Sequence, residues 1–84
     1  MKNKVIVITG GSSGIGKALA EKFGREGGRI LITGRDPAEL EKAVTELQQK
    51  GITVAGFRAD VSQEEDNRKM ADEAVRLYGT IDVL

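Results

Sequence analysis

Apolar positions along the chain follow two different patterns. Short, continuous apolar runs occur at residues 5–8 and, within the expected second strand 29–33, at residues 30–32. Such runs, without polar residues in alternation, are typical of strands that are buried on both faces of a parallel sheet. A third strand is expected over residues 52–57. A further apolar run at residues 81–84 predicts the start of a fourth strand.

Three helices are expected between these runs, because apolar residues recur there at helical spacing. Their apolar stripes are Ile15, Ala18, Leu19 and Phe23; then Leu40, Ala43, Val44 and Leu47; then Met70, Ala74, Leu77 and Tyr78. The segment 36–39, Asp-Pro-Ala-Glu, predicts a helix start with Asp36 as the N-cap and Pro37 in the first turn. The segment 62–65, Ser-Gln-Glu-Glu, has the pattern of a capping box with Ser62 as the N-cap.

The order strand-helix repeated three times, followed by a strand, predicts an α/β fold with parallel strands and right-handed crossovers. It corresponds to the first half of a Rossmann-like, three-layer doubly wound sheet with strand order 3-2-1-4. We expect residues 1–84 to be the N-terminal part of one such domain. The apolar fourth strand would otherwise form an uncovered edge, which favours association, so a homo-oligomer or a longer fold is expected.

The composition excludes several classes of function. The 13 basic and 13 acidic residues cancel, so no net field favours nucleic acid or an anionic membrane. The chain has no Cys and no His, which excludes disulfides, thiolate zinc sites and histidine general bases. It has neither an apolar segment long enough to span a membrane nor a signal-peptide pattern, so a cytoplasmic location is the default expectation.

A glycine-rich loop between the first strand and the first helix carries the clearest chemical signal. Residues 8–18 read Ile-Thr-Gly-Gly-Ser-Ser-Gly-Ile-Gly-Lys-Ala. Glycines allow a sharp turn and a close approach of the backbone to a ligand, and the following helix directs its free N–H groups at an anion. A tight turn that binds nothing would not need three glycines, at positions 10, 14 and 16. We therefore predict a phosphate site.

Two common phosphate-binding patterns do not fit this loop. A triphosphate P-loop needs Ser or Thr after Lys17 to bind magnesium, and the chain has Ala18 there. Lys17 is then expected to be a solvated cation. The spacing G-x-G-x-x-G also fails, because Leu19 stands where the third glycine belongs.

The pattern that does fit is T-G-x-x-x-G-x-G, with Thr9, Gly10, Gly14 and Gly16 at its fixed positions. The chain resembles the short-chain dehydrogenase/reductase family over its whole length. Three motifs carry the resemblance: this loop, Asp60-Val61 and the stretch 78–84. The resemblance implies an NAD(P)-dependent oxidoreductase acting on a carbonyl, alcohol or enoyl substrate of unknown identity. It also implies that the following residues contact the cofactor: Gly10, Ser12, Ser13, Gly14, Ile15, Gly16, Arg35, Asp60 and Val61.

The end of the second strand indicates which cofactor is bound. Relatives specific for NAD carry an acid where this chain has Gly34, and Arg35 follows it. An arginine suits the 2′-phosphate of NADP because its planar fork donates paired, charge-assisted hydrogen bonds. We therefore expect NADP rather than NAD. Asp36 is better explained as a helix cap and Arg58 as surface charge. Asp60 could be a solvated acid in a turn, but the resemblance implies that its carboxylate accepts from the adenine amino group, and Ser62 as the expected cap leaves it free to do so.

No catalytic residue is predicted within residues 1–84. The resemblance implies that catalysis requires an Asn-Asn-Ala-Gly segment, a later Ser, and a Tyr followed four positions on by Lys. The single tyrosine, Tyr78, is followed at that spacing by Asp82 and is expected to serve packing. The alternatives are therefore the cofactor-binding part of an enzyme and a dinucleotide-binding module without turnover.

Overall fold

The fold alternates strands and helices in the predicted order. The structure is a computed structural model that describes residues 3–10, 14–60 and 62–79. The elements are β1 (Val5–Thr9), α1 (Gly14–Arg25), β2 (Arg29–Gly34), α2 (Pro37–Gln49), β3 (Thr53–Arg58) and α3 (Glu64–Tyr78). The three predicted strands and three predicted helices are confirmed, with the third strand beginning and ending one residue later than expected. The predicted fourth strand, 81–84, lies outside the described residues.

The three strands form one parallel sheet in the order β1-β2-β3, with β2 in the centre. Thr9, Thr33 and Phe57 lie side by side in register near the carboxyl ends of the strands. The observed order agrees with the 3-2-1 part of the predicted order, and the position of a fourth strand is not described. All three carboxyl ends therefore meet at one edge of the sheet, which is where open α/β sheets bind ligands.

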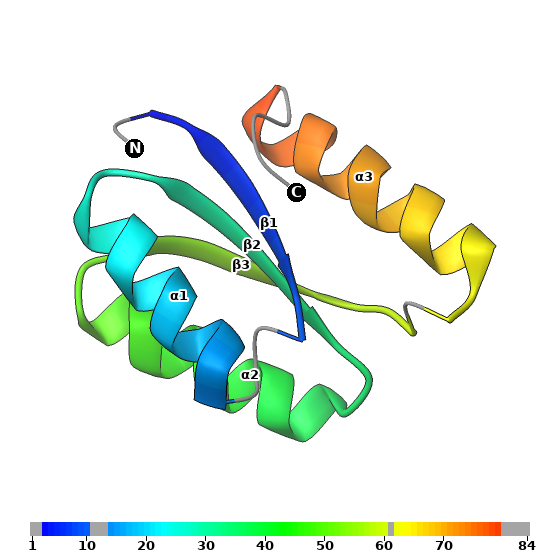
Figure 1. The fold of residues 1–84 in the computed structure, drawn as a ribbon, viewed down its shortest axis with the longest axis horizontal. Coiled ribbons are helices and arrows are strands. Elements are labelled where there is room, and N and C mark those ends of the chain that lie inside the picture. The colour runs from blue at the N-terminus through cyan, green and yellow to red at the C-terminus, as the bar shows by residue number, and fades with distance from the viewer. Residues whose placement is uncertain (1–2, 11–13, 61, 80–84) are drawn as a thin grey trace.

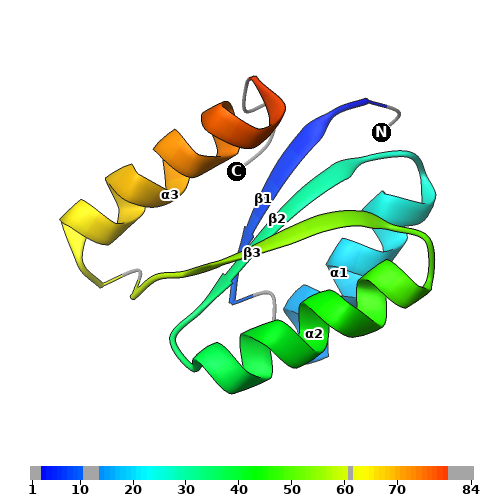
Figure 2. The same ribbon diagram turned by 180° about the vertical axis from the view of Figure 1, so that it is seen from behind.

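Helices cover both faces of the sheet, which gives three layers. Figures 1 and 2 show α1 and α2 on one face and α3 on the other. Because side chains alternate along a strand, Ile30 and Ile32 face α1 and α2 whereas Leu31 faces α3. Both faces of β1 and β2 are thus buried, as their apolar runs predicted, whereas β3 lies at an edge of the sheet and only Val54 in it is fully buried.

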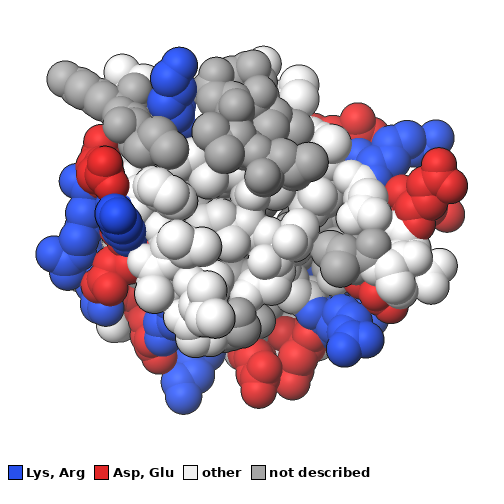
Figure 3. Space-filling view, viewed as in Figure 1, with Lys and Arg blue, Asp and Glu red and all other residues white. Residues whose placement is uncertain are grey.

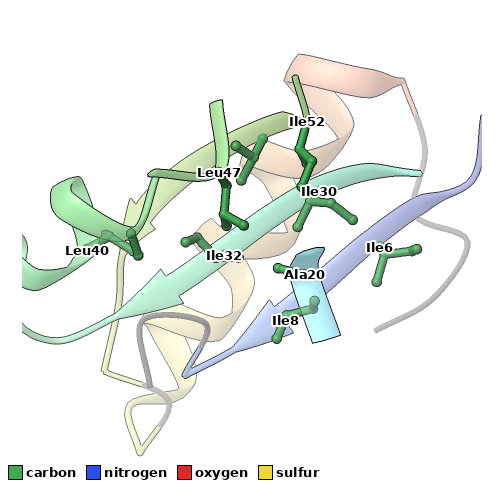
Figure 4. Packing of buried hydrophobic residues seen from close by; sticks show 10 residues of the cluster. Ile6, Ile8, Ala20, Ile30, Ile32, Leu40, Leu47 and Ile52 are labelled. Carbon is green, nitrogen blue, oxygen red and sulfur yellow. The ribbon is translucent and has the colours of Figure 1, made fainter. Parts of the chain in front are cut away.

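The larger of the two core clusters lies under α1 and α2 (Figure 4). It contains Ile6, Ile8, Ala20, Ile30, Ile32, Leu40, Ala43, Leu47, Ile52 and Val54. The cluster under α3 is smaller and contains Val7, Leu31, Met70 and Ala74. Most of the buried apolar side chains therefore lie between the sheet and the helices α1 and α2.

The predicted apolar stripe of α1 is wrong in three of its four positions. Ile15 is 80% exposed and Leu19 is 41% exposed, and Ala18 is also exposed. Gly16 and Ala20 are buried instead, and Phe23 packs against the core. Small residues allow the helix to approach the sheet closely, so the larger apolar side chains are turned away from it.

The stripe of α3 was predicted correctly except at Leu77. Met70 and Ala74 are buried and Tyr78 is half-buried, as expected, but Leu77 is 39% exposed.

Uncharged surface occupies the middle of the face drawn in Figure 3, with Lys, Arg, Asp and Glu around its rim. The exposed large apolar residues come from α1 and α3 and are Ile15, Leu19, Val75 and Leu77.

The two predicted helix starts have different outcomes. The Asp36 carboxylate accepts hydrogen bonds from the backbone N–H groups of Ala38 (2.9 Å) and Glu39 (3.4 Å), which confirms the cap of α2. The capping box at Ser62 is wrong, because α3 begins at Glu64 after an N-cap residue that makes no side-chain capping bond. The Ser62 hydroxyl donates instead to the carboxylate of Asp60 (2.7 Å), in a charge-assisted hydrogen bond.

Candidate functional site

The predicted site residues that the structure describes gather at the carboxyl edge of the sheet. Gly10 directly follows β1, α1 begins at Gly14, Arg35 directly follows β2, and Asp60 lies two residues beyond β3. Ser12, Ser13 and Val61 lie outside the described residues. Three separate parts of the sequence thus meet at one end of the fold (Figure 1).

The turn after β1 uses glycine for a backbone reason and for a spatial one. Gly10 has φ +68°, a left-handed conformation that residues other than glycine rarely adopt. A Cβ built on Gly14 would meet no atom within 4 Å, so the fold itself does not require glycine there. The absence of a side chain at Gly14 leaves open space at the N-terminus of α1, where the positive end of the helix dipole favours an anion.

The other two predicted residues of this segment differ in exposure. Ile15 is highly exposed in the first turn of α1, and Gly16 is buried against the sheet. Gly16 is therefore a packing glycine, and Gly10 and Gly14 are the two whose conformation and space fit a phosphate. The structure thus leaves space for a ligand beside Gly14.

Lys17 is not the free cation that the sequence suggested. Its ammonium group forms an ion pair with the carboxylate of Glu46 on α2, and only about a third of each side chain is exposed (32% and 36%). The prediction of a solvated lysine is thus wrong, and the reason is that α2 packs alongside α1 and brings a carboxylate to it. The partner supplied by α2 gives Lys17 a role within the fold.

Arg35 and Asp60 are brought together by the pairing of β2 with β3. The N–H of Ala59 donates to the carbonyl oxygen of Gly34 (3.1 Å), which continues the strand pairing up to the two site residues. Arg35 is exposed, and no ion pair or hydrogen bond engages its side chain among the described residues. A guanidinium group is thus available at the end of β2, where Gly34 offers no carboxylate to repel a phosphate.

The carboxylate of Asp60 is held from within its own loop. Its Oδ1 accepts hydrogen bonds from the backbone N–H of Ser62 (3.0 Å) and from the Ser62 hydroxyl (2.7 Å). These bonds, the hydroxyl first, lower the pKa of Asp60 below its ordinary value, and the positive charges of Arg35 and Arg58 lower it further. Asp60 is therefore ionised at neutral pH and is an acceptor only.

Sequence reasoning missed the role of Ser62, and it missed Asp66. The Oδ2 atom of Asp66, on α3, accepts a hydrogen bond from the backbone N–H of Asp60 (2.9 Å). The spacing Asp-x-Ser was a usable signal, because an Asp carboxylate commonly accepts from the backbone N–H two residues on. The capping pattern over the same residues concealed it.

Comparison with known proteins identifies the family. The sequence model described as short chain dehydrogenase matches residues 4–84. The chain belongs to this family. Among the described residues, the short-chain dehydrogenase chain has no helix long and apolar enough to cross a membrane, and no cluster of acidic residues that could hold a metal ion.

Individual relatives are similar over the whole chain. A probable 2,4-dienoyl-CoA reductase of Bacillus subtilis is 40% identical over 84 residues, which is all of this chain and 33% of the relative. A metagenomic short-chain oxidoreductase in complex with NADP is 32% identical with a TM-score of 0.90 (100% of this chain, 38% of that one). A short-chain dehydrogenase/reductase of Burkholderia phymatum in complex with NAD is 35% identical with a TM-score of 0.94 (98% and 30%). The chain spans about a third of the length of the curated relatives it matches.

Proposed function

We propose that this chain supplies the cofactor-binding part of an NADP(H)-dependent oxidoreductase. The observation that carries the proposal is the meeting of a glycine turn, a helix N-terminus and the unpaired Arg35 at one edge of the sheet. When bound, NADP(H) supplies or accepts the hydride, and the substrate would be a carbonyl, alcohol or enoyl compound. The probable dienoyl-CoA reductase among the relatives is consistent with the enoyl class.

We expect the predicted site residues to divide the cofactor among them. The backbone of Gly10 and the N-terminus of α1 at Gly14 would hold the pyrophosphate, with Ser12, Ser13 and Ile15 in the same loop. Arg35 would hold the 2′-phosphate through paired, charge-assisted hydrogen bonds. The carboxylate of Asp60 would accept the adenine amino group, with Val61 beside it.

The preference for NADP rests on Arg35, because relatives occur in complex with either cofactor. Gly34 lacks the carboxylate that would accept from the ribose hydroxyls of NAD and repel a 2′-phosphate. The carboxylate of Asp36, the acid that follows Arg35 in the sequence, already accepts hydrogen bonds from the first turn of α2. The residues at the end of β2 therefore favour the phosphorylated cofactor.

Titration of NADPH and NADH against the protein tests the proposal. We expect tighter binding of NADPH, and Arg35→Ala should weaken it about 10- to 100-fold while leaving NADH binding nearly unchanged. Arg58→Ala is the matched control, since Arg58 is also exposed and near Asp60 but is the last residue of a different strand, β3. Equal affinities for NADPH and NADH in the unmodified protein would overturn the NADP preference.

A dinucleotide-binding module without turnover is the second candidate. The observation favouring it is that Tyr78, the one tyrosine within residues 1–84, donates its hydroxyl hydrogen bond to the backbone carbonyl of Ile30 (2.9 Å) and so offers no acid–base group in this segment. Binding of NADPH without its oxidation in the presence of carbonyl and enoyl substrates would support this candidate. NADPH oxidation would support the enzyme.

A further inference from the structure

The two carboxylate oxygens of Asp60 have different surroundings. Both hydrogen bonds from Ser62 end on Oδ1, at 3.0 Å from its backbone nitrogen and 2.7 Å from its hydroxyl oxygen. Among the residues that the structure describes, no donor contacts Oδ2. Because two donors on one atom fix the carboxylate plane, the position of the second oxygen is determined as well.

The backbone of Asp60 is fixed too. Its N–H donates to Oδ2 of Asp66 on α3 (2.9 Å), and its carbonyl oxygen accepts from the N–H of Gln63 (2.9 Å). Side chain and backbone are therefore held by the segment that connects β3 to α3. A carboxylate held in this way loses little conformational freedom when it binds a ligand, which increases its contribution to affinity.

We propose that Ser62 is a positioning residue that orients Asp60 so that Oδ2 accepts a hydrogen bond from the exocyclic amino group of a bound adenine. This proposal rests on the proposed function and deepens it. The ligand class that the arrangement selects is a dinucleotide whose base carries an amino group. An ionised carboxylate accepts from an amine and cannot donate to a carbonyl, so a hypoxanthine base, with an oxo group at the same place, should bind less well.

The charges around Asp60 support an ionised carboxylate. Arg35 and Arg58 lower its pKa, and the hydrogen bonds from Ser62 lower it more. The acidic side chain of Asp66 accepts from the backbone N–H of Asp60. The side chain of Asp60 therefore stays an acceptor throughout the neutral range.

Binding of NADPH and of its hypoxanthine analogue tests the proposal. The unmodified protein should prefer the adenine form about 10-fold or more, as expected for a hydrogen bond to a charged group. Ser62→Ala should reduce that preference several-fold, whereas Ser62→Thr, which keeps the hydroxyl, should retain it. Gln63→Ala is the control, because the Gln63 side chain makes no capping bond.

The outcomes separate this proposal from the proposed function. If the unmodified protein binds neither dinucleotide, the proposed function fails. If it binds both and Ser62→Ala keeps the original preference, only the role of Ser62 is overturned. A ligand-free readout is the carboxyl pKa of Asp60 measured by ¹³C NMR, which should rise in Ser62→Ala and stay low in Ser62→Thr; an unchanged pKa in Ser62→Ala would also overturn the role.

Discussion

Lys17 of α1 is paired with Glu46 of α2, and one turn further along α1 Glu21 is paired with Lys50, the C-cap residue of α2, with the charges reversed (2.7 Å). The lysine that gives the glycine-rich loop its likeness to a triphosphate-binding loop thus belongs to a ladder of ion pairs between two helices. Its partner explains a lysine at this position without any nucleotide. The likeness to a P-loop is therefore a coincidence of spacing, as Ala18 had already indicated.

Breaking the Lys17–Glu46 pair should affect stability slightly and cofactor binding not at all. Since both side chains are about a third exposed, a double-mutant cycle of Lys17→Met and Glu46→Gln should give a coupling of about 0.2–1 kcal/mol. Urea denaturation measures the coupling, and NADPH titration of Lys17→Met measures binding. Lys22→Met, an exposed lysine on the same helix, is the control. Loss of NADPH binding in Lys17→Met alone would contradict the role given to the pair.

Much of the fold could be predicted from the sequence because the strongest signals are local. The run Val5 to Ile8, continuous and β-branched, marks a strand buried on both faces, and Asp36 followed by proline marks a helix start. The packing of α1 could not be predicted in the same way. Apolar periodicity weighs large side chains such as Ile15 and Leu19, whereas the approach of this helix to the sheet is decided by the small residues on its other side.

The candidate site was predictable at the level of motifs and not at the level of contacts. The positions of Gly10, Gly14 and Arg35 follow from the strand ends, which the sequence marks clearly. The partnership of Asp60 with Ser62 depended on a choice between two local hydrogen bonds, a helix cap and a carboxylate contact. Both are compatible with the same residues, and only the start of α3 at Glu64 decides between them.

Two glycines of α1 should respond oppositely to alanine. A Cβ at Gly24 would lie 2.3 Å from Cγ2 of the buried Ile52, and relief of such a clash costs about 1–3 kcal/mol, more than the ~1 kcal/mol gained in helix propensity. Gly24→Ala should therefore lower the free energy of unfolding. A Cβ at Gly14 meets nothing, so Gly14→Ala should preserve stability and weaken NADPH binding by tenfold or more.

Denaturation and NADPH titration of both glycine variants check this contrast. The reverse result, with Gly14→Ala unstable and still binding normally, would remove the argument that the space beside Gly14 is kept for a ligand.

Replacing Thr33 with valine should stabilise the protein. The Thr33 side chain is fully buried, and among the described residues its hydroxyl has no hydrogen-bond partner. A buried, unsatisfied hydroxyl costs about 1–3 kcal/mol, and valine has nearly the same shape without it. In thermal unfolding, Thr33→Val should raise the free energy of unfolding by about 1 kcal/mol. The control Thr9→Val should change it little, because Thr9 is an exposed threonine beside Thr33 in register. Destabilisation by Thr33→Val would mean that the hydroxyl is satisfied in solution.

Tyr78 should make the protein less stable at alkaline pH. Burial raises the pKa of its phenol, with a smaller opposing effect of Arg29, and its hydroxyl donates to the Ile30 carbonyl. As the pH rises above about 10, the unfolded chain releases the phenolic proton before the folded chain does, so the free energy of unfolding falls.

Because Tyr78 is the only tyrosine, phenolate absorbance follows this group alone, and the midpoint of its titration should lie above the ordinary value. Tyr78→Phe should lose about 0.5–1.5 kcal/mol at neutral pH with the hydrogen bond and show a shallower alkaline decline. An ordinary or lowered midpoint would show that the ring is hydrated and that α3 is not anchored to β2 through this hydroxyl.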